Sequence, residues 1–575
     1  MDVENEEEMV REIQTVTELR FDLAHSAPIT MSSLAEKLGY LSDTEFATQL
    51  LQGEALIPSD VDDTTAMVLD EIAKVGRTVQ SFSGNKLVIT PAKFCRYWRK
   101  IKESTSSAAS GIHFGHYRAA TSSDKITNFL SKKITIVARV GCPPDRWGVG
   151  LQVILEKIAG VALVSKLRSI LLMEGDQNYF NKWAFGYEAL NALAETGYLL
   201  DEQYNQGEST AEDTIMDSRL TFDISRQQRI PMASASADTA NCYDRINHII
   251  MAFLLLAVTG WVGAITCLLH PIQTMKFFQR TARGDSSSYF GGKNRFRPLQ
   301  GLCQGNTAAP GCTTMLFAIL LRCYLHKGMG AKIVSPISQH IIECIGTQFV
   351  DDSDLYAWLT ELNNSREVFY EIQSSLLTWG NLLCASGGAL KPAKCYWHNV
   401  GYECNQFGVW DYAEMVNADL LVPLPDGSLV PIKQLHVHEP MEMLGTFSCP
   451  SGDDSTHLQR KILDRIEKWS NRTKNSHLPA RLAWMSYRFK LWPGIRYGLA
   501  TLATPLDVAS TLLANSNYRM LSFLGVNRNV KRGWRSIPRA FGGMGLFSFP
   551  VEQLICWINM LTQHFGVPTV LGNKF

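Results

Sequence analysis

Phe349-Val350-Asp351-Asp352 is the stretch around which the rest of the chain is organised. It ends an apolar, β-prone run at 344–350, and a second apolar run, 355–359, follows soon after it. This pattern predicts a β-hairpin with two adjacent acids at its tip. Crowded carboxylates repel one another and resist ionisation, so such a pair usually needs a divalent cation. A solvated turn is the alternative interpretation, and the surrounding sequence has to decide between the two.

Asp238 is the nearest upstream candidate to join this acid pair. It ends a run of small residues, 233–237, that is typical of a strand, and Tyr243 stands five positions later, just before Asp244. An acid at this strand end could meet Asp351 and Asp352 across neighbouring strands. Three carboxylates could then hold two cations ~3.5–4 Å apart, the arrangement that clamps the attacking and leaving oxygens in phosphoryl transfer. Alternatively, Asp238 or Asp244 caps the helix that follows.

Two groups of cations could serve a phosphate-bearing substrate. Lys166 and Arg168 begin a β-prone run, 166–172, and residues two apart on a strand share one face. A strand edge guarded by charge is the alternative interpretation. After the acid pair, the turn 386–390 leads to Lys391 and Lys394, which could reach a pyrophosphate leaving group. A solvated lysine turn fits the local pattern equally well.

A glycine-containing loop at 299–310 runs directly into the helix-like stretch 313–321. Gln304 and Gly305 lie in this loop. Because glycine lets the backbone approach closely, the loop could lie against a flat ligand such as a base pair.

Composition indicates a large globular protein of several domains, since 46% of the 575 residues are hydrophobic. The formal net charge of +0 hides a strong asymmetry. Residues 1–72 carry 17 acids against three cations, whereas 456–500 carries ten cations against two acids, and 508–551 contains no acid. A basic C-terminal third predicts a polyanion partner.

Cysteine usage indicates an intracellular, reducing compartment. The 13 cysteines are scattered singly, without a CxxC pair, and free thiols are expected. A zinc site is not predicted, because the nearest candidates lack paired ligand spacing. They are Cys395, His398, Cys404, His436 and His438.

No signal peptide is expected from the acidic N-terminus. The uncharged stretch 249–269 has the length of a membrane span, but its neighbouring charges and its internal glycines and threonines favour a helix buried in a large domain. No membrane partner is expected. The first hundred residues are predicted to form helical segments, the first seventy being acidic enough for partial disorder. A helix at 91–102 should bury an aromatic stripe against the next domain, and 104–110 is a plausible linker.

Taken in order, these motifs resemble the reverse transcriptase family, and more narrowly the non-LTR, LINE-type retrotransposon enzymes. Three motifs of that family stand in this chain as D-x-x-x-x-Y-D from Asp238, Q-G-x-x-x-x-P from Gln304, and F-V-D-D from Phe349. Leu444 and Gly445 look like the primer grip, and 390–394 looks like the lysine motif. Ala309 replaces the serine and Lys391 the asparagine that are common in the family.

The resemblance implies an α+β fold shaped as a right hand, with fingers, a palm built on a small antiparallel sheet, and a helical thumb. The boundaries would be an acidic, mostly helical extension at 1–104, fingers at 105–230, palm at 231–450, and a basic helical thumb and C-terminal region at 451–575. Asp426-Gly427 predicts an added hairpin near the end of the palm. In the thumb, four residues at helical spacing predict a buried stripe; they are Leu458, Ile462, Ile466 and Trp469.

The activity implied is RNA-directed DNA synthesis, in which dNTPs are added to the 3′-hydroxyl of a DNA or RNA primer on an RNA template. Asp238, Asp351 and Asp352 would hold two Mg²⁺, for which Mn²⁺ can substitute. Asp351 is expected to reach across and share the metals with Asp238, and Asp352 is the less certain ligand of the three, since consecutive strand residues tend to point apart.

The other motif residues have implied roles as well. Lys166 and Arg168 would neutralise the triphosphate, and Lys394 would protonate pyrophosphate. Tyr243 would exclude a 2′-hydroxyl, whereas Gln304 and Gly305 would line the templating base pair.

Two alternatives stay open. An RNA-dependent RNA polymerase shares the chemistry, although Tyr243 and the F-V-D-D motif argue against it. A silent or domesticated RNA-binding remnant of a retroelement is the other, favoured by the lack of a preceding endonuclease module and opposed by the intact acids. Template specificity and oligomeric state are not encoded in any motif.

Overall fold

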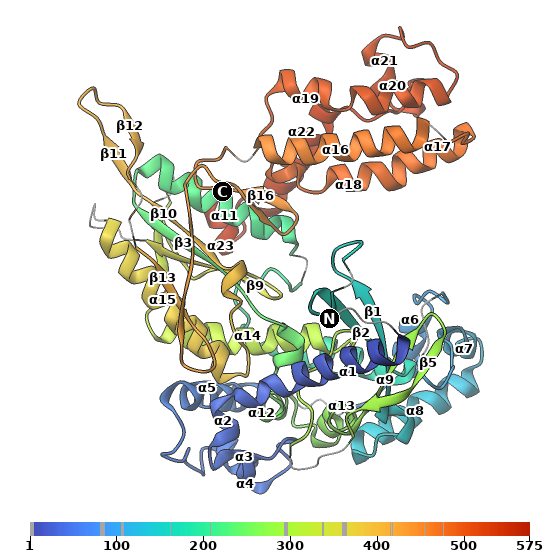
Figure 1. Ribbon diagram of the computed structural model, residues 1–575, viewed down its shortest axis with the longest axis vertical. Helices are drawn as coiled ribbons and strands as arrows, with labels where there is room; N and C mark the ends of the chain where they lie inside the picture. Colours follow the sequence, from blue (N-terminus) through green and yellow to red (C-terminus); the bar gives the residue numbers. More distant parts are fainter. Residues whose placement is uncertain are drawn as a thin grey trace.

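The computed structural model describes residues 5–80, 87–104, 108–161, 163–207, 209–292, 297–335, 339–358, 365–414, 416, 418–453, 455–474 and 476–575. Helices predominate, and the strands gather into one six-stranded sheet, one four-stranded sheet and three hairpins. Figure 1 shows the C-terminal helices standing apart from the sheets and the N-terminal helices.

The six-stranded sheet has the order β13-β14-β10-β3-β9-β8. Its pairings are antiparallel except that between β10 and β14, which is parallel. The strands are β3 (Met232–Asp238), β8 (Gly346–Phe349), β9 (Asp352–Trp358), β10 (Tyr396–Val400), β13 (Leu420–Pro423) and β14 (Leu429–Leu435). The expected hairpin at Asp426-Gly427 is confirmed as the turn between β13 and β14.

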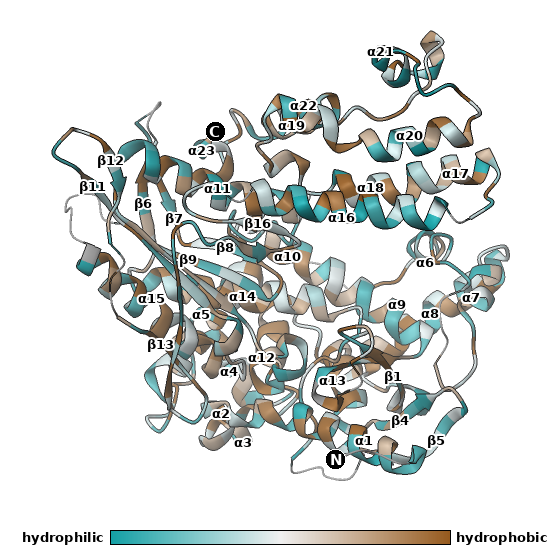
Figure 2. Ribbon diagram, turned by 45° about the horizontal axis from the view of Figure 1, so that its top comes forward, coloured by the Kyte–Doolittle hydropathy of each residue, from teal (hydrophilic) through white to brown (hydrophobic). Residues whose placement is uncertain are grey.

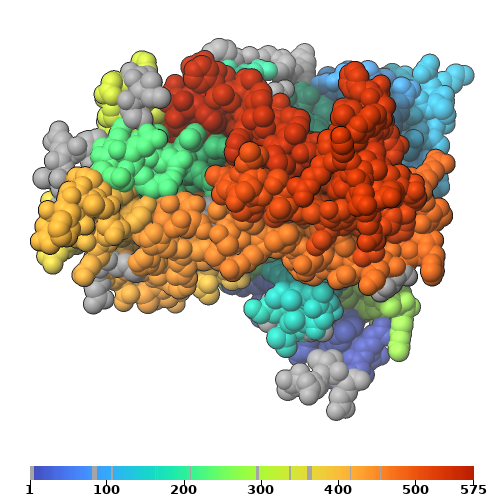
Figure 3. All heavy atoms as spheres, turned by 90° about the horizontal axis from the view of Figure 1, so that it is seen from above, coloured from blue at the N-terminus to red at the C-terminus, as the bar shows by residue number. Residues whose placement is uncertain are grey.

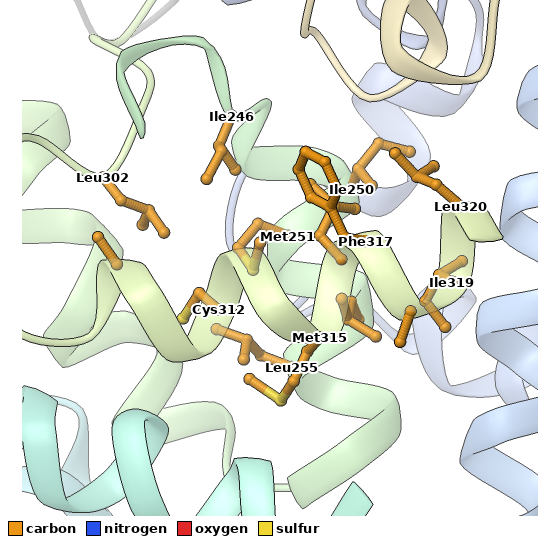
Figure 4. Packing of buried hydrophobic residues seen from close by; sticks show 14 of the residues in the cluster. Ile246, Ile250, Met251, Leu255, Leu302, Cys312, Met315, Phe317, Ile319 and Leu320 are labelled. Atoms are coloured by element: carbon orange, nitrogen blue, oxygen red, sulfur yellow. The ribbon is translucent and has the colours of Figure 1, made fainter. Parts of the chain in front are cut away.

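Helix α15 (Ser365–Ala385) packs directly on the six-stranded sheet. Three further long helices belong to the same large hydrophobic core; they are α5 (Asp63–Gln80), α12 (His248–Thr259) and α14 (Ala309–His326). Apolar residues occupy nearly every position of α12, which is buried all round, and α14 is buried along most of its length. Figure 4 shows Met251 and Leu255 of α12 beside Cys312 and Met315 of α14.

The prediction of one buried helix at 249–269 is right about burial and wrong about continuity. Gly260 takes a left-handed conformation, φ 65°, and its N–H bonds to the carbonyl of Leu256, which ends α12. A second helix, α13 (Val262–Thr274), begins two residues later. In the part of the chain described, no helix is both long enough and apolar enough to cross a membrane.

The acidic N-terminal segment is folded from residue 5, so the expectation of partial disorder is wrong. Helix α1 (Glu6–Asp22) buries Val10, Ile13 and Phe21 on one face, and Phe21 stacks on Phe277, with ring centroids 5.3 Å apart. The buried residues of α1 include none of its acids. The helices that follow are α2 (Pro28–Met31), α3 (Leu34–Leu38) and α4 (Glu45–Gln52). Composition alone misjudged this segment because its apolar residues, although few, share one face.

The aromatic stripe predicted at 91–102 is confirmed. Helix α6 (Pro91–Trp98) buries Phe94 and Trp98. Phe94 meets Tyr179 of α9 (Gly175–Trp183), and Trp98 stacks on Tyr117 of α7 (Phe114–Ala120), with ring centroids 5.3 and 4.5 Å apart respectively. Part of the predicted linker, 105–107, lies outside the described residues.

A smaller sheet lies beside these helices, with the order β2-β1-β4-β5. Its strands are β1 (Val149–Glu156), β2 (Leu167–Leu172), β4 (Lys276–Thr281) and β5 (Gly284–Phe290). Helix α8 (Asp124–Val140) packs against α6 and α13. The other short elements are α10 (Leu190–Ala194), β6 (Ala331–Val334), β7 (Ile341–Cys344), β11 (Tyr402–Cys404), β12 (Trp410–Tyr412), β15 (Met441–Met443) and β16 (Thr446–Ser448).

The C-terminal helices have a hydrophobic core of their own. They are α16 (Ser455–Lys474), α17 (Ala480–Ser486), α18 (Trp492–Arg496), α19 (Leu506–Leu512), α20 (Ala514–Phe523), α21 (Arg532–Ser536) and α22 (Phe549–His564). The stripe predicted on α16 is confirmed, since all four of its residues are buried. Figure 2 shows the mixed hydrophilic and hydrophobic faces of α16.

The chain ends in α23 (Val570–Lys574), which returns from the C-terminal helices to α11 (Ala211–Gln228). Figure 3 shows the red C-terminal residues beside green α11 on the face seen from above. Lys574 forms a wholly buried ion pair with Asp217, and its Nζ also donates to Thr221 Oγ1 at 2.9 Å. Helix α23 therefore ties the C-terminal helices to the body that carries the six-stranded sheet.

Candidate active site

The predicted acidic hairpin is confirmed as the connection between β8 and β9. Phe349 pairs with Asp352 across the two strands, which leaves Val350 and Asp351 as a two-residue turn. Val350 takes the left-handed conformation, φ 60°. Tight hairpin turns need such a residue because its backbone twist matches that of the strands.

Asp238 lies directly opposite Asp352 in the register of β3 and β9. Side chains of directly opposed residues lie on the same face of a sheet, with Cβ atoms ~4.5–5.5 Å apart. Asp351 is joined to the same corner by its backbone, since the N–H of Thr239 donates to its carbonyl at 3.2 Å. The register therefore places Asp352 opposite Asp238, and the charge of Asp238 acts on both Asp351 and Asp352. The three acids meet at one corner of the sheet.

Burial and mutual repulsion perturb these carboxyls. Burial raises the pKa of Asp352 to about 7, and the charges of Asp351, Asp354 and Asp238 add to the effect. Burial also raises the pKa of Asp351, where the repulsion of Asp238 is opposed by Lys394 and Arg168. A corner of this kind binds positive charge, because a cation relieves the repulsion.

Lys394 supplies one such charge. Its Nζ lies 2.5 Å from Oδ2 of Asp238, whose side chain is only 14% exposed. Burial acts to lower the pKa of Lys394, but the hydrogen bond and the charge of Asp238 outweigh it and raise the pKa. Lys391 meets Asp238 only through its backbone, with its N–H donating to the Asp238 carbonyl at 2.9 Å. Of the two lysines singled out in the sequence, Lys394 is the one whose side chain reaches the acids.

Arg168 approaches the corner from β2, but Lys166 does not share its strand. Arg168 lies opposite Leu155 of β1 and acts electrostatically on Asp351. Lys166 instead ends a short 3₁₀ turn, Val164–Lys166, and its carbonyl accepts the N–H of Lys157 at 3.3 Å. The prediction of a common face is wrong because β2 begins one residue later, at Leu167.

Arg20 and Lys157 join the cations at this corner, and sequence reasoning missed both. Burial lowers the pKa of Lys157, and the charges of Lys391, Arg20, Arg168 and Lys394 lower it further. Lys157 could have been suspected from its place in the β1–β2 hairpin. Arg20 carried no signal, since it is one cation in an acidic helix that reaches the site only through tertiary packing.

Tyr243 and Asp244 lie in a 3₁₀ turn, Cys242–Arg245, just after β3. Neither Asp244 nor Asp238 caps α12, because Asn247 does so by accepting the N–H groups of Ile249 and Ile250. Burial raises the pKa of Asp244 to about 6. Tyr243 is half-buried; burial raises its pKa to about 12, with contributions from Cys242 and Asp351. The Tyr243 ring therefore lies within electrostatic range of the acid corner.

The loop containing Gln304 and Gly305 packs on β2. The N–H of Leu171 donates to the carbonyl of Gln304 at 2.7 Å. Gly305 has φ 110°, and a Cβ there would lie 2.1 Å from the carbonyl oxygen of Leu171. Further back, the N–H of Leu302 donates to the Tyr243 carbonyl at 2.7 Å. The loop is thus attached both to the strand that carries Arg168 and to the turn that carries Tyr243.

Leu444 and Gly445 form the two-residue turn of the β15–β16 hairpin, with φ 47° and 86°. Tyr497 Oη donates to the Leu444 carbonyl at 2.5 Å, and Lys461 Nζ donates to the Gly445 carbonyl at 2.8 Å. Both donors belong to the C-terminal helical region. The turn borders a hollow of about 470 Å³ whose lining includes Asp238, Asp352, Asp354, Lys394, Met443 and Leu444.

A second hollow, of about 820 Å³, borders the Gln304–Gly305 loop. Its lining combines cations with aromatic rings and reaches Gly305, Asn306 and Thr307; the charged and aromatic members include Lys93, Arg96, Tyr97, Lys100, Lys182 and Tyr187. Lys182 Nζ lies 4.8 Å from the centre of the Tyr187 ring. Cations interleaved with aromatic rings suit single-stranded nucleic acid.

The acid corner has the donor chemistry of a Mg²⁺ site, since carboxylate oxygen is the ligand that this ion prefers. Within the described ranges, however, no group of three or more His, Cys, Asp or Glu side chains is gathered closely enough to hold a metal ion as it stands. The raised pKa of Asp352 and the approach of Lys394 to Asp238 both show a demand for positive charge at this corner. The residues present therefore fit a divalent cation in chemistry.

The cysteines are free thiols, as expected, and the five Cys and His candidates for zinc do not form a metal-binding group among the residues that the structure describes. Cys395 is instead buried beneath the acid corner, where its Sγ lies 3.9 Å from the Asp238 carbonyl. Comparison with known protein families and with curated proteins finds no match to this chain.

Proposed function

We propose that this protein is a nucleotidyltransferase, an RNA-directed DNA polymerase of the retrotransposon type. The observation that carries the proposal is the meeting of Asp238, Asp351 and Asp352 at one corner of the six-stranded sheet, with Lys394 and Arg168 beside them. Acids that attract divalent cations, next to cations that attract phosphate, are what phosphoryl transfer between a hydroxyl and a triphosphate requires.

The acids and the cations of this corner would have different roles in the reaction. Two Mg²⁺ or Mn²⁺ ions bound by the three acids would activate the primer 3′-hydroxyl and neutralise the triphosphate. Arg168, Lys157 and Arg20 provide positive charge for the phosphate oxygens, and the fork of an arginine suits them especially well. Lys394 holds a proton next to Asp238 and would pass it to the departing pyrophosphate.

The two hollows described above would serve different strands, one the primer and the other the template. The Leu444-Gly445 turn borders the hollow that contains Asp238 and Asp352, where the primer end has to lie. The basic, aromatic hollow that includes Gly305 in its lining would receive the unpaired template. The C-terminal helices, as a thumb, would hold the product duplex.

The test is primer extension on an RNA template with the Asp351→Asn variant. We expect extension to be lost, by about 10³-fold or more, because the amide cannot supply a charged ligand. Template binding should remain measurable. Asp426→Asn, which changes an exposed acid at another hairpin tip, is the matched control and should extend primers normally. Extension by the Asp351→Asn protein at the parental rate would refute the proposal.

The sugar preference separates this proposal from an RNA-dependent RNA polymerase. Tyr243 lies near the acids and would block a 2′-hydroxyl, so Tyr243→Val is expected to raise incorporation of rNTPs relative to dNTPs by about 10-fold or more. The ratio is measured by single-nucleotide extension with each substrate. A parent enzyme that already prefers rNTPs would favour the RNA polymerase, and one that binds RNA without extending any primer would favour a silent remnant.

A further inference from the structure

A second basic surface lies at the far end of the C-terminal helices, around α21 (Figure 1). Six cations and no acid occur in 508–551. We call the group Arg528, Lys531, Arg532, Arg535 and Arg539, together with Trp534 and Phe541, the distal basic surface. The proposed polymerase function assigns the C-terminal helices as a whole to the product duplex and gives these residues no role of their own.

Hydrogen bonds hold the segment that carries the distal basic surface in a defined conformation. The N–H of Met544 donates to the Trp534 carbonyl at 3.0 Å, and the N–H of Leu546 donates to the Arg535 carbonyl at 2.8 Å. Arg535 donates from Nε to the Val530 carbonyl at 3.0 Å and from Nη2 to the Arg528 carbonyl at 2.7 Å. These arginine bonds end on uncharged oxygens, so they order the loop without neutralising the positive charge.

Flat groups accompany the charge. The Arg535 guanidinium lies 5.0 Å from the centre of the Tyr518 ring, and that of Arg539 lies 3.9 Å from the centre of the Trp484 ring. Two further rings face solvent, Trp534 at 53% and Phe541 at 79% exposure. Exposed rings beside arginines provide both stacking surfaces for bases and contacts for phosphates.

A hollow of about 360 Å³ lies between α20, α21 and the start of α22. Arg532 and Arg535 border it, and its lining, partly apolar, also includes the uncharged polar side chains of Ser510, Asn517, Tyr518, Ser536 and Ser548. Hydroxyl and amide groups can donate to phosphate, sugar or base oxygens, and they add directional contacts to the general attraction of the cations.

We propose that the distal basic surface is a second nucleic-acid-binding site, one that holds single-stranded polynucleotide apart from the acid corner. An anionic membrane would also attract the cations. It is disfavoured because helices that lie on membranes carry a long continuous apolar face, whereas α21 spans only five residues. The site stands on its own contacts and does not depend on the polymerase proposal.

The test measures binding of the full chain to a labelled single-stranded RNA of ~40 nucleotides across a range of salt concentrations, in EDTA. The variant replaces Arg528, Lys531 and Arg532 by glutamine. Each lost phosphate contact should lower the slope of log K against log salt by about 0.7, so the slope should fall by about 2. The matched control replaces Lys125, Lys132 and Lys133, three exposed cations of α8, and should leave the slope unchanged.

Stacking is tested separately with Trp534→Ala, which should weaken RNA binding about 10-fold, whereas Trp534→Phe should retain most of it. Single-stranded DNA of the same sequence shows whether the 2′-hydroxyl contributes. Equal slopes for the glutamine variant and the parent would overturn the proposal. So would a glutamine variant that loses binding to phosphatidylserine vesicles while it binds RNA normally. Primer extension on a short template is scored in parallel, so a failure of the polymerase proposal is seen independently.

Discussion

Asp352 shows how its surroundings change an ordinary carboxyl. Burial raises its pKa from the usual 3.8 to about 7. Between these values the folded chain binds more protons than the unfolded chain, so this group lowers the free energy of unfolding as the pH rises through that window. The contribution of Asp352 to the free energy of unfolding is most favourable below pH 3.8 and is lost by about pH 7. Asp352 is therefore a residue that the fold tolerates at a cost in stability.

Replacing Asp352 by asparagine should stabilise the protein at pH 8, by about 1 kcal/mol or more once solvent screening is allowed for. The advantage should vanish near pH 4. Thermal melting at both pH values measures it. Adding Mg²⁺ at pH 8 should raise the melting temperature of the parent more than that of the variant, because only the parent keeps all three acids. An asparagine variant less stable than the parent at pH 8 would contradict this account.

Single residues divide sharply into those that the sequence reveals and those that it does not. Asp238, Asp351 and Asp352 are singled out because the motifs that contain them follow, in order, the pattern of the reverse transcriptase family, whereas the local pattern alone also fits a solvated turn. Arg20 and Lys157 are not, because their proximity to the acids depends on how α1 and the β1–β2 hairpin pack. The sequence also could not predict that Asp352 lies opposite Asp238, since this depends on the register of β3 and β9.

Among the elements, the Gln304–Gly305 loop and β2 behave as one unit. Gly305→Ala would place a methyl group 2.1 Å from the Leu171 carbonyl and should separate the loop from β2. Since β2 carries Arg168, we expect primer extension to fall by about 10-fold or more. Steady-state extension assays give the size of the loss.

Gly284→Ala is the matched control for this prediction. Gly284 also has a positive φ, 128°, but nothing lies within 4 Å of a Cβ placed there. Both substitutions strain the backbone, by roughly 1 kcal/mol, and only the one at Gly305 meets an obstacle. Equal losses of activity in the two variants would show that the contact with β2 is unimportant.

Elements with a strong internal pattern were predictable. The stripe on α16, the aromatic face of α6 and the β8–β9 hairpin all follow from spacing within one segment. The break between α12 and α13 was missed because Gly260 reads as one small residue within an apolar run. The sequence did not predict that α1 is folded, because its stability comes from partners such as Phe277, which lie far away in the sequence.

At the scale of the whole molecule, the buried ion pair between Lys574 and Asp217 joins the last helix to α11. Lys574→Met should lower the free energy of unfolding by about 3–5 kcal/mol, because it leaves Asp217 charged and without its cation. Urea denaturation measures the change. Adding Asp217→Asn to the variant should recover a large part of the loss, and Lys474→Met, at an exposed position, should have little effect. A double variant as unstable as Lys574→Met alone would assign the loss to packing.

The long sequence separation of that ion pair has a consequence during synthesis. Lys574 leaves the ribosome 357 residues after Asp217, roughly 20–70 s later at ordinary rates of translation. Through that interval Asp217 keeps its water, since a lone carboxylate is costly to bury. The contacts that Lys574 makes with α11 and with Cys344 of β7 consequently form only after Lys574 has emerged. Nascent chains that lack Lys574 should therefore leave this place between α11 and β7 open to chaperones.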